Sequence, residues 1–166
     1  MKEIKLTIDG KEVQLTEEQI KALNLVLEEK LRNPFKKVNG EYYCIKETGE
    51  IYNYWDNQDS YDNQIYDNAN YFNDPAFARI LMLDQLLQRK LLRFAYENNC
   101  LDTALRNGIT QHWYIGYDYK TKDYVACSSY QISEANTVYF NSENAAKCAI
   151  AQVIRHFELE HPEYKW

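Results

Sequence analysis

The side chains best suited to binding or chemistry lie between Glu47 and Ala78, where carboxylates are interleaved with aromatic rings and no Lys or Arg occurs. Carboxylates pair with basic side chains, and aromatic rings attract cations over their faces. The composition therefore predicts a surface that binds a partner protein rich in Lys and Arg. Its candidate contacts are Tyr54, Trp55, Asp56, Asp59, Tyr61, Asp62 and Tyr66. A polar loop that solvates one edge of a sheet would have the same composition, so this alternative stays open.

Three of these acidic residues, Asp56, Asp59 and Asp62, recur at every third position, a spacing also found in cation-binding loops. An EF-hand loop, however, places its ligands at alternating positions and requires Gly at the sixth. Tyr61 stands where that Gly belongs. We therefore expect no metal site in this segment.

The chain has three histidines, His112, His156 and His161, and none belongs to a recognisable catalytic or zinc-binding spacing. Isolated glycines do not form a phosphate-binding loop. His156 and Glu160 lie one helical turn apart, which is typical of an ordinary surface pair. We expect no catalytic residues and no cofactor, and hence a protein that is not an enzyme.

A second candidate surface is basic and belongs to the helix predicted to begin at Pro75. Arg89 and Arg93 share a face one turn apart, with Arg79 and Lys90 nearby. Together with tyrosines that stack on bases, these residues would bind a nucleic acid or nucleotide. The net charge of −6, from 19 basic and 25 acidic residues, disfavours a general nucleic-acid binder. Nucleic acid therefore remains the alternative to a protein partner.

A chain of 166 residues is long enough to bury a hydrophobic core without disulfides. Its 15 tyrosines favour half-buried strands and binding surfaces. The four cysteines are far apart, and no signal peptide or membrane-spanning apolar run occurs. We expect a cytoplasmic protein with free thiols and no membrane association. The oligomeric state stays open, because hairpin edges could pair in a dimer.

The first 33 residues predict a hairpin followed by a helix. Alternating apolar residues flank Asp9–Gly10, a strong two-residue turn signal. A capping box at Thr16–Gln19 begins a helix that should run to about Leu31, where Asn33–Pro34 ends it. We expect residues 1–33 to form an N-terminal addition to the rest of the chain.

The remaining sequence contains an internal repeat. Tyr71–Arg79 is echoed by Tyr139–Lys147: each has an aromatic pair, an Asn and a capping residue before an Ala-bearing helical run. The repeats span residues 41–101 and 112–166. Each predicts strands followed by a helix, and two such units can cover each other's apolar faces. The expected fold class is α+β, with antiparallel sheet packed on a long central helix in one compact domain of residues 1–166.

The elements within the repeats follow from local signals. The first repeat predicts strands at 42–46 and 51–55, an irregular polar run from 55 to 70, and a helix from Pro75 to about Asn98 capped by Asp74. The second predicts strands at 113–119, 124–129 and 137–140, then a final helix capped by Ser142. The wide apolar stripe of the longer helix predicts burial on more than one side.

Four segments of the chain resemble uncharacterised proteins of phages and integrated mobile elements of Gram-positive gut bacteria. They are Trp55–Phe72, Leu91–Asn99, Thr137–Glu143 and His161–Trp166. The resemblance implies a mobile-element accessory protein located in the cytoplasm of the host cell. It also implies that the partner is a host or defence protein, which the accessory protein binds and inhibits, with a CRISPR system as one candidate target.

Overall fold

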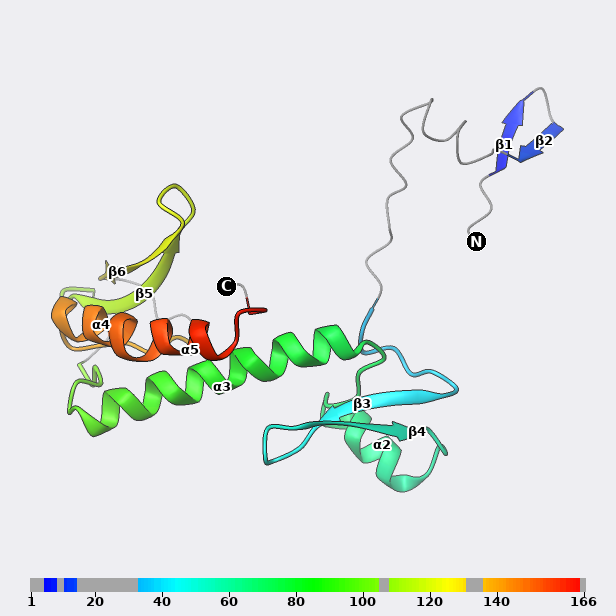
Figure 1. Ribbon diagram of the computed structural model, residues 1–166, viewed down its shortest axis with the longest axis horizontal. Helices are drawn as coiled ribbons and strands as arrows, with labels where there is room; N and C mark the ends of the chain where they lie inside the picture. The colour runs from blue at the N-terminus through cyan, green and yellow to red at the C-terminus, as the bar shows by residue number, and fades with distance from the viewer. Residues whose placement is uncertain (1–4, 9–10, 15–32, 105–107, 131–135, 165–166) are drawn as a thin grey trace. The chain divides into compact units, whose positions relative to one another are not determined.

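The computed structural model describes residues 5–8, 11–14, 33–104, 108–130 and 136–164 (Figure 1). The chain divides into two units, Met1–Asn33 and Pro34–Trp166. In the first unit, β1 (Lys5–Ile8) and β2 (Lys11–Gln14) pair antiparallel, with Ile8 opposite Lys11. This confirms the predicted hairpin. The turn at residues 9–10 and the helix predicted to begin at residue 16 lie outside the described residues.

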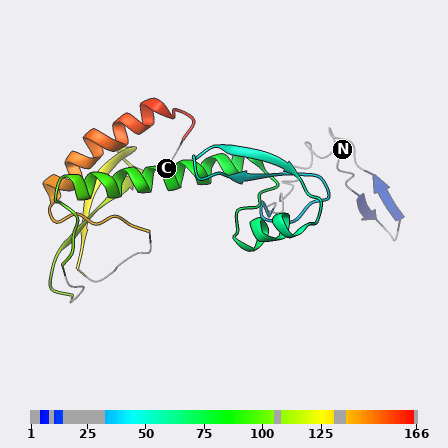
Figure 2. The ribbon, with the colours of Figure 1, turned by 90° about the horizontal axis from the view of Figure 1, so that it is seen from below.

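The second unit begins with a hairpin covered on one side by a short helix. Strands β3 (Glu41–Ile45) and β4 (Ile51–Trp55) pair antiparallel, close to their predicted bounds. Helix α2 (Ser60–Asp67) lies against this hairpin, as Figure 2 shows. The irregular run predicted at 55–70 is therefore wrong where α2 forms. A small core of Tyr42, Cys44, Ile65 and Tyr71 joins the hairpin to α2.

Helix α3 (Pro75–Glu97) is the longest described element and ends within one residue of its predicted end. Asp74 caps its first turn by accepting hydrogen bonds from the backbone N–H groups of Ala76 and Phe77, at 2.9 and 3.2 Å. Its apolar stripe is buried in the main core of this unit. The buried α3 residues are Ala78, Met82, Leu83, Leu87, Leu91, Phe94 and Ala95.

The rest of the main core comes from a second hairpin and the C-terminal helix. Strands β5 (His112–Asp118) and β6 (Asp123–Ser129) pair antiparallel, which confirms the second predicted hairpin. Figure 1 shows the C-terminal helix, in orange and red, lying along α3. It consists of α4 (Glu143–Ala149), a π-helical turn η1 (Ile150–Ile154) and α5 (Arg155–Glu160). The mixed α and β class, with antiparallel hairpins packed on a long helix, is confirmed.

The π-helical turn contributes two side chains to the core. Ile150 and Ile154, its first and last residues, are both buried, and Phe157 is buried about one turn later. The strand predicted at 137–140 is reduced to bridges at Phe140, which pairs with Leu101 and Trp113.

Both hairpins of the second unit pair with a single residue from outside the hairpin, through an isolated β-bridge. Phe72 bridges antiparallel to Tyr43 of β3, and Phe140 bridges antiparallel to Trp113 of β5. Both phenylalanines are almost completely buried. Each bridge leads directly into a helix, α3 in one case and α4 in the other.

The Asn that follows each Phe also makes matching contacts. The backbone N–H of Asn73 donates to the carbonyl of Pro34, and that of Asn141 donates to the carbonyl of Cys100. Both acceptors lie in the segment that precedes the first strand of the hairpin. A duplicated unit would make such contacts in both copies, and the duplication itself stays a prediction.

Candidate functional site

The pairing of β3 with β4 decides which aromatic residues share a surface. Tyr42 lies opposite Tyr54, and Cys44 lies opposite Tyr52. Directly opposed residues point to the same side of a sheet, and successive residues of one strand point to opposite sides. Tyr52 and Tyr54 therefore share one face of the hairpin, and Trp55 lies on the other. The predicted contact residues Tyr54 and Trp55 are thus adjacent in sequence but do not form one surface.

The face that carries Tyr52 and Tyr54 also holds an ammonium group. Nζ of Lys46 lies 5.3 Å from the centre of the Tyr52 ring and 5.0 Å from that of Tyr54. The ring of Tyr61, from α2, contacts Tyr54 edge-on at 5.9 Å between centres. Tyr52 is 47% exposed and Tyr61 is 46% exposed. We call these four residues, Lys46, Tyr52, Tyr54 and Tyr61, the tyrosine face.

The Tyr54 side chain influences the titration of two polar neighbours. Interaction with the Tyr54 hydroxyl is the first cause that raises the pKa of Lys46 above its ordinary value. The same hydroxyl is the first cause that raises the pKa of Tyr61. At neutral pH the Lys46 ammonium is therefore charged and the Tyr61 phenol is neutral.

Two of the predicted acidic contacts are buried beneath this region instead of lying on its surface. Asp62 accepts hydrogen bonds from the Tyr42 hydroxyl at 2.7 Å and from the backbone N–H of Asn57 at 2.8 Å. Asp56 accepts from the Tyr71 hydroxyl at 3.0 Å. Both carboxylates are almost fully buried. They hold the turn between β4 and α2 in place and are not available to a partner.

The electrostatics of Asp62 follow from these contacts. Burial disfavours its charged form, but the hydrogen bonds from Tyr42 and from the backbone outweigh burial and lower its pKa below the ordinary value. Burial, followed by the hydrogen bond to Asp62, raises the pKa of Tyr42. The pair is therefore a buried carboxylate held by a neutral phenol.

The remaining acidic and aromatic candidates lie at the surface of α2. Asp59 is exposed and caps the helix by accepting from the backbone N–H groups of Tyr61 and Asp62, at 2.8 and 3.0 Å. Tyr66 is 41% exposed, and Nζ of Lys37 lies 4.8 Å from the centre of its ring. The segment without Lys or Arg thus receives two lysines, Lys37 and Lys46, from the part of the chain that precedes it.

Trp55 is the most exposed of the predicted aromatic contact residues, at 62%. It lies opposite Glu41 at the end of the hairpin. The structure brings together Tyr54 and Tyr61, adds Lys46 and Tyr52, and leaves Trp55 on the other side of the sheet. Strand alternation would have separated Trp55 from Tyr54 at the level of sequence.

The residues of the alternative basic surface are mostly paired with acids. Arg79 pairs with Glu163 at 2.9 Å and Lys90 with Glu160 at 2.8 Å, while Arg93 lies 3.9 Å from Glu97. Arg89 is exposed and makes no ion pair with a residue in the described part of the chain. The four cations therefore do not form a continuous unpaired patch.

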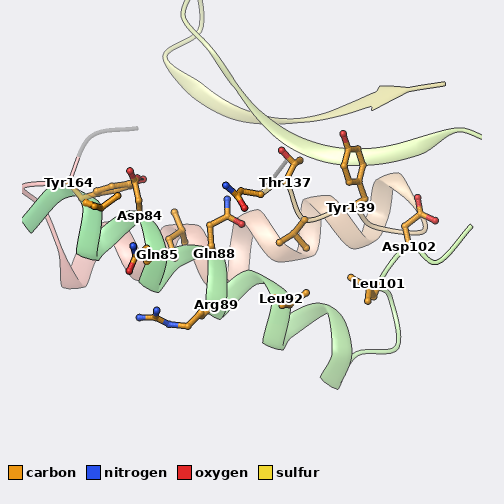
Figure 3. Close-up of a pocket in the computed structure, with 14 residues that line it drawn as sticks. Asp84, Gln85, Gln88, Arg89, Leu92, Leu101, Asp102, Thr137, Tyr139 and Tyr164 are labelled. Carbon is orange, nitrogen blue, oxygen red and sulfur yellow. The ribbon is translucent and has the colours of Figure 1, made fainter. Parts of the chain in front are cut away.

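Arg89 lines a groove of about 960 Å³ between α3 and the segment that leads to Phe140 (Figure 3). From α3 come the side chains of Gln85, Gln88 and Leu92, and from the facing segment those of Thr137 and Tyr139. Each end of the groove carries an acidic residue, Asp84 and Asp102. The groove is mixed in character, with no concentration of one charge.

Both acidic side chains of the groove make hydrogen bonds with other parts of the protein. The Tyr164 hydroxyl donates to Oδ1 of Asp84 at 2.5 Å. Nδ1 of His112 lies 2.5 Å from Oδ2 of Asp102, with both side chains buried. Nε2 of His112 has no hydrogen-bond partner among the described residues. In a catalytic triad that nitrogen would contact the nucleophile. No local pattern in the sequence predicts this pair, because its members come from a loop and from β5.

Comparison with known proteins identified no relative: neither a protein family, nor a curated protein, nor a solved structure matches the chain. Among the described helices, none combines the length and apolar character needed to cross a membrane.

Proposed function

We propose that this protein is a non-enzymatic binding protein whose partner is a protein with exposed Lys and Arg side chains. The tyrosine face carries the proposal, because its rings already hold an ammonium group at 5.0 and 5.3 Å. Cations over aromatic faces are attracted within about 6 Å of the ring centre. The face is thus suited to the side chains by which a basic partner would be recognised.

The surroundings of the face favour the same partner. Glu47 and Glu50, in the turn between β3 and β4, and Asp59, at the start of α2, are exposed. No described Lys or Arg forms an ion pair with these three acids. Acidic groups around an aromatic centre attract a basic surface over a distance and raise its association rate.

The resemblance to mobile-element proteins supports the identity of the proposed partner. It suggests a host or defence protein that is inhibited when bound, with a CRISPR system among the candidate targets. The resemblance is an argument by analogy and specifies no residue of the interface.

Nucleic-acid binding is a weaker alternative. It would use Arg89 together with Arg79, Lys90 and Arg93, three of which are paired with acids. A titration of DNA and RNA binding against salt tests it, since phosphate contacts predict affinity that falls steeply as salt rises. In that case Arg89→Gln would weaken binding and changes in the tyrosine face would not.

The proposal is tested by capture from a bacterial host lysate with three immobilised proteins: the wild type, Tyr52→Leu/Tyr61→Leu, and the control Tyr96→Leu/Tyr119→Leu. The control pair is also exposed, at 65% and 79%, and lies outside the tyrosine face. All three proteins carry the same net charge.

We expect at least one protein with a basic surface to be retained by the wild type and by the control and lost from the face variant. Its association rate, measured on the purified pair, should fall as salt rises. If every protein captured by the wild type is captured equally by the face variant, the tyrosine face is not the binding surface and the proposal fails.

A further inference from the structure

Lys46 is placed where the basic group of a partner would bind. It follows β3 directly and points to the same side of the hairpin as Tyr52 and Tyr54. Its ammonium contacts two rings at once, at 5.3 Å from the centre of the Tyr52 ring and 5.0 Å from that of Tyr54. These are the contacts that an aromatic site offers to a Lys or Arg side chain from another protein.

Another cation can replace the Lys46 ammonium at this site. Lys46 is half-buried, and one of the two rings it covers, Tyr52, is almost half exposed. No ion pair anchors its ammonium among the described residues. A lysine held only by aromatic rings contributes little stability and loses side-chain freedom.

Lys37 repeats the arrangement on the other side of α2. Its ammonium lies 4.8 Å from the centre of the Tyr66 ring. It differs in having a strong polar anchor, a 2.5 Å hydrogen bond to Oδ1 of Asn63. We therefore expect Lys46, and not Lys37, to be the lysine that exchanges.

We propose that Lys46 competes internally for the rings of the tyrosine face. A Lys or Arg side chain of the partner binds there by displacing the Lys46 ammonium from the rings of Tyr52 and Tyr54. This inference rests on the proposed function and specifies its chemistry. A displaced Lys46 remains charged, and the neighbouring exposed carboxylates Glu47 and Glu50 can receive either cation.

The experiment uses the full chain and a fluorescently labelled decalysine peptide as the probe, at about physiological ionic strength. Its Kd is measured for the wild type, Lys46→Met and the control Lys120→Met. Lys120 is exposed in the turn between β5 and β6, away from the tyrosine face. Both variants lose one positive charge, so the general attraction of an acidic protein for the peptide increases equally in both.

We expect Lys46→Met to bind decalysine about two- to fivefold more tightly than Lys120→Met, which corresponds to one cation–π contact removed from competition. An equal or weaker affinity of Lys46→Met, with clear binding by the wild type, would overturn the inference while leaving the proposed function intact. If none of the three proteins binds, the proposed function fails as well.

A second measurement on the wild type does not depend on any variant. Protons held over a ring face are shifted upfield in the NMR spectrum, so the ε-methylene protons of Lys46 report its position. Addition of decalysine should move them to the frequency of a solvated lysine. If they stay shifted while the peptide is bound, Lys46 has not been displaced and the inference is wrong.

Discussion

The hydroxyl of Tyr42 donates a 2.7 Å hydrogen bond to Oδ1 of Asp62, and both side chains are buried. Tyr42 belongs to β3 and Asp62 to α2, so this bond joins the hairpin to the helix that supplies Tyr61 to the tyrosine face. The ring of Tyr42 also stacks on that of Tyr71, with 4.2 Å between centres. The tyrosine face therefore rests on a buried polar network.

Loss of either partner should destabilise the protein. Tyr42→Phe removes a hydrogen bond to a charged acceptor and should cost about 1.5–3 kcal/mol. Asp62→Asn should cost a similar amount, and the double variant should cost at least about 0.5 kcal/mol less than the sum, because the two groups interact. Urea denaturation of the wild type and the three variants gives the four unfolding free energies of this double-mutant cycle.

The control for this cycle is Asp67→Asn, an exposed carboxylate on the same helix. It should change the free energy of unfolding by no more than about 0.5 kcal/mol. Strict additivity of Tyr42→Phe and Asp62→Asn would show that the bond contributes nothing to stability.

The contribution of Asp62 should depend on pH in a defined direction. Its pKa is lower in the folded protein than the value of about 3.9 expected in an unfolded chain. A lowered pKa stabilises the folded state above the unfolded value, and this stabilisation is lost as the pH falls through the folded value. The difference in unfolding free energy between wild type and Asp62→Asn should therefore be full at neutral pH and shrink below about pH 4.

That comparison is made by urea denaturation at a series of pH values from about 7 down to 3. Other carboxylates with lowered pKa, among them Asp118 and Asp123, titrate in the same range but are common to both proteins. A difference that grows as the solution becomes acidic would contradict the assignment of Asp62 as a stabilised carboxylate.

Two adjacent leucines of α3 test the position of this helix in the core. Leu91 is 3% exposed and Leu92 is 42% exposed. Leu91→Ala should cost about 2–5 kcal/mol, as buried leucines do, whereas Leu92→Ala should cost about 1 kcal/mol or less. Equal effects of the two changes on the urea midpoint would mean that α3 is not oriented as described.

The strands and the long helix could be predicted from sequence because their signals are local. Alternation and turn residues predict β3 to β6 within one residue or so, and Asp74–Pro75 fixes the start of α3. Helix α2 was missed because it buries little apolar surface: Asp62 and Ile65 are its buried residues. The Asp59–Asp62 capping box is its signal in the sequence, and the same spacing is also found in cation-binding loops.

The residue types of the candidate site could be predicted from the sequence, but their arrangement in space could not. The sequence shows that the segment is acidic and aromatic, but the burial of Asp56 and Asp62 depends on Tyr71 and Tyr42, which are distant in the chain. The contact of Lys46 with the rings depends on the register in which β3 pairs with β4. Because the two buried acids support the fold, the binding surface is best tested at its exposed tyrosines.

The central claim is that the rings of the tyrosine face bind the cations of a partner, and the affinity for decalysine tests it most directly. The proteins to compare are the wild type, Tyr52→Leu/Tyr61→Leu and Tyr52→Phe/Tyr61→Phe. All three have the same net charge, and the Phe variant keeps the rings that the Leu variant loses. We predict that the Leu variant binds roughly five- to thirtyfold more weakly than the wild type, while the Phe variant stays within about twofold of it. Equal affinities of the Leu and Phe variants, with both folded, would contradict the claim.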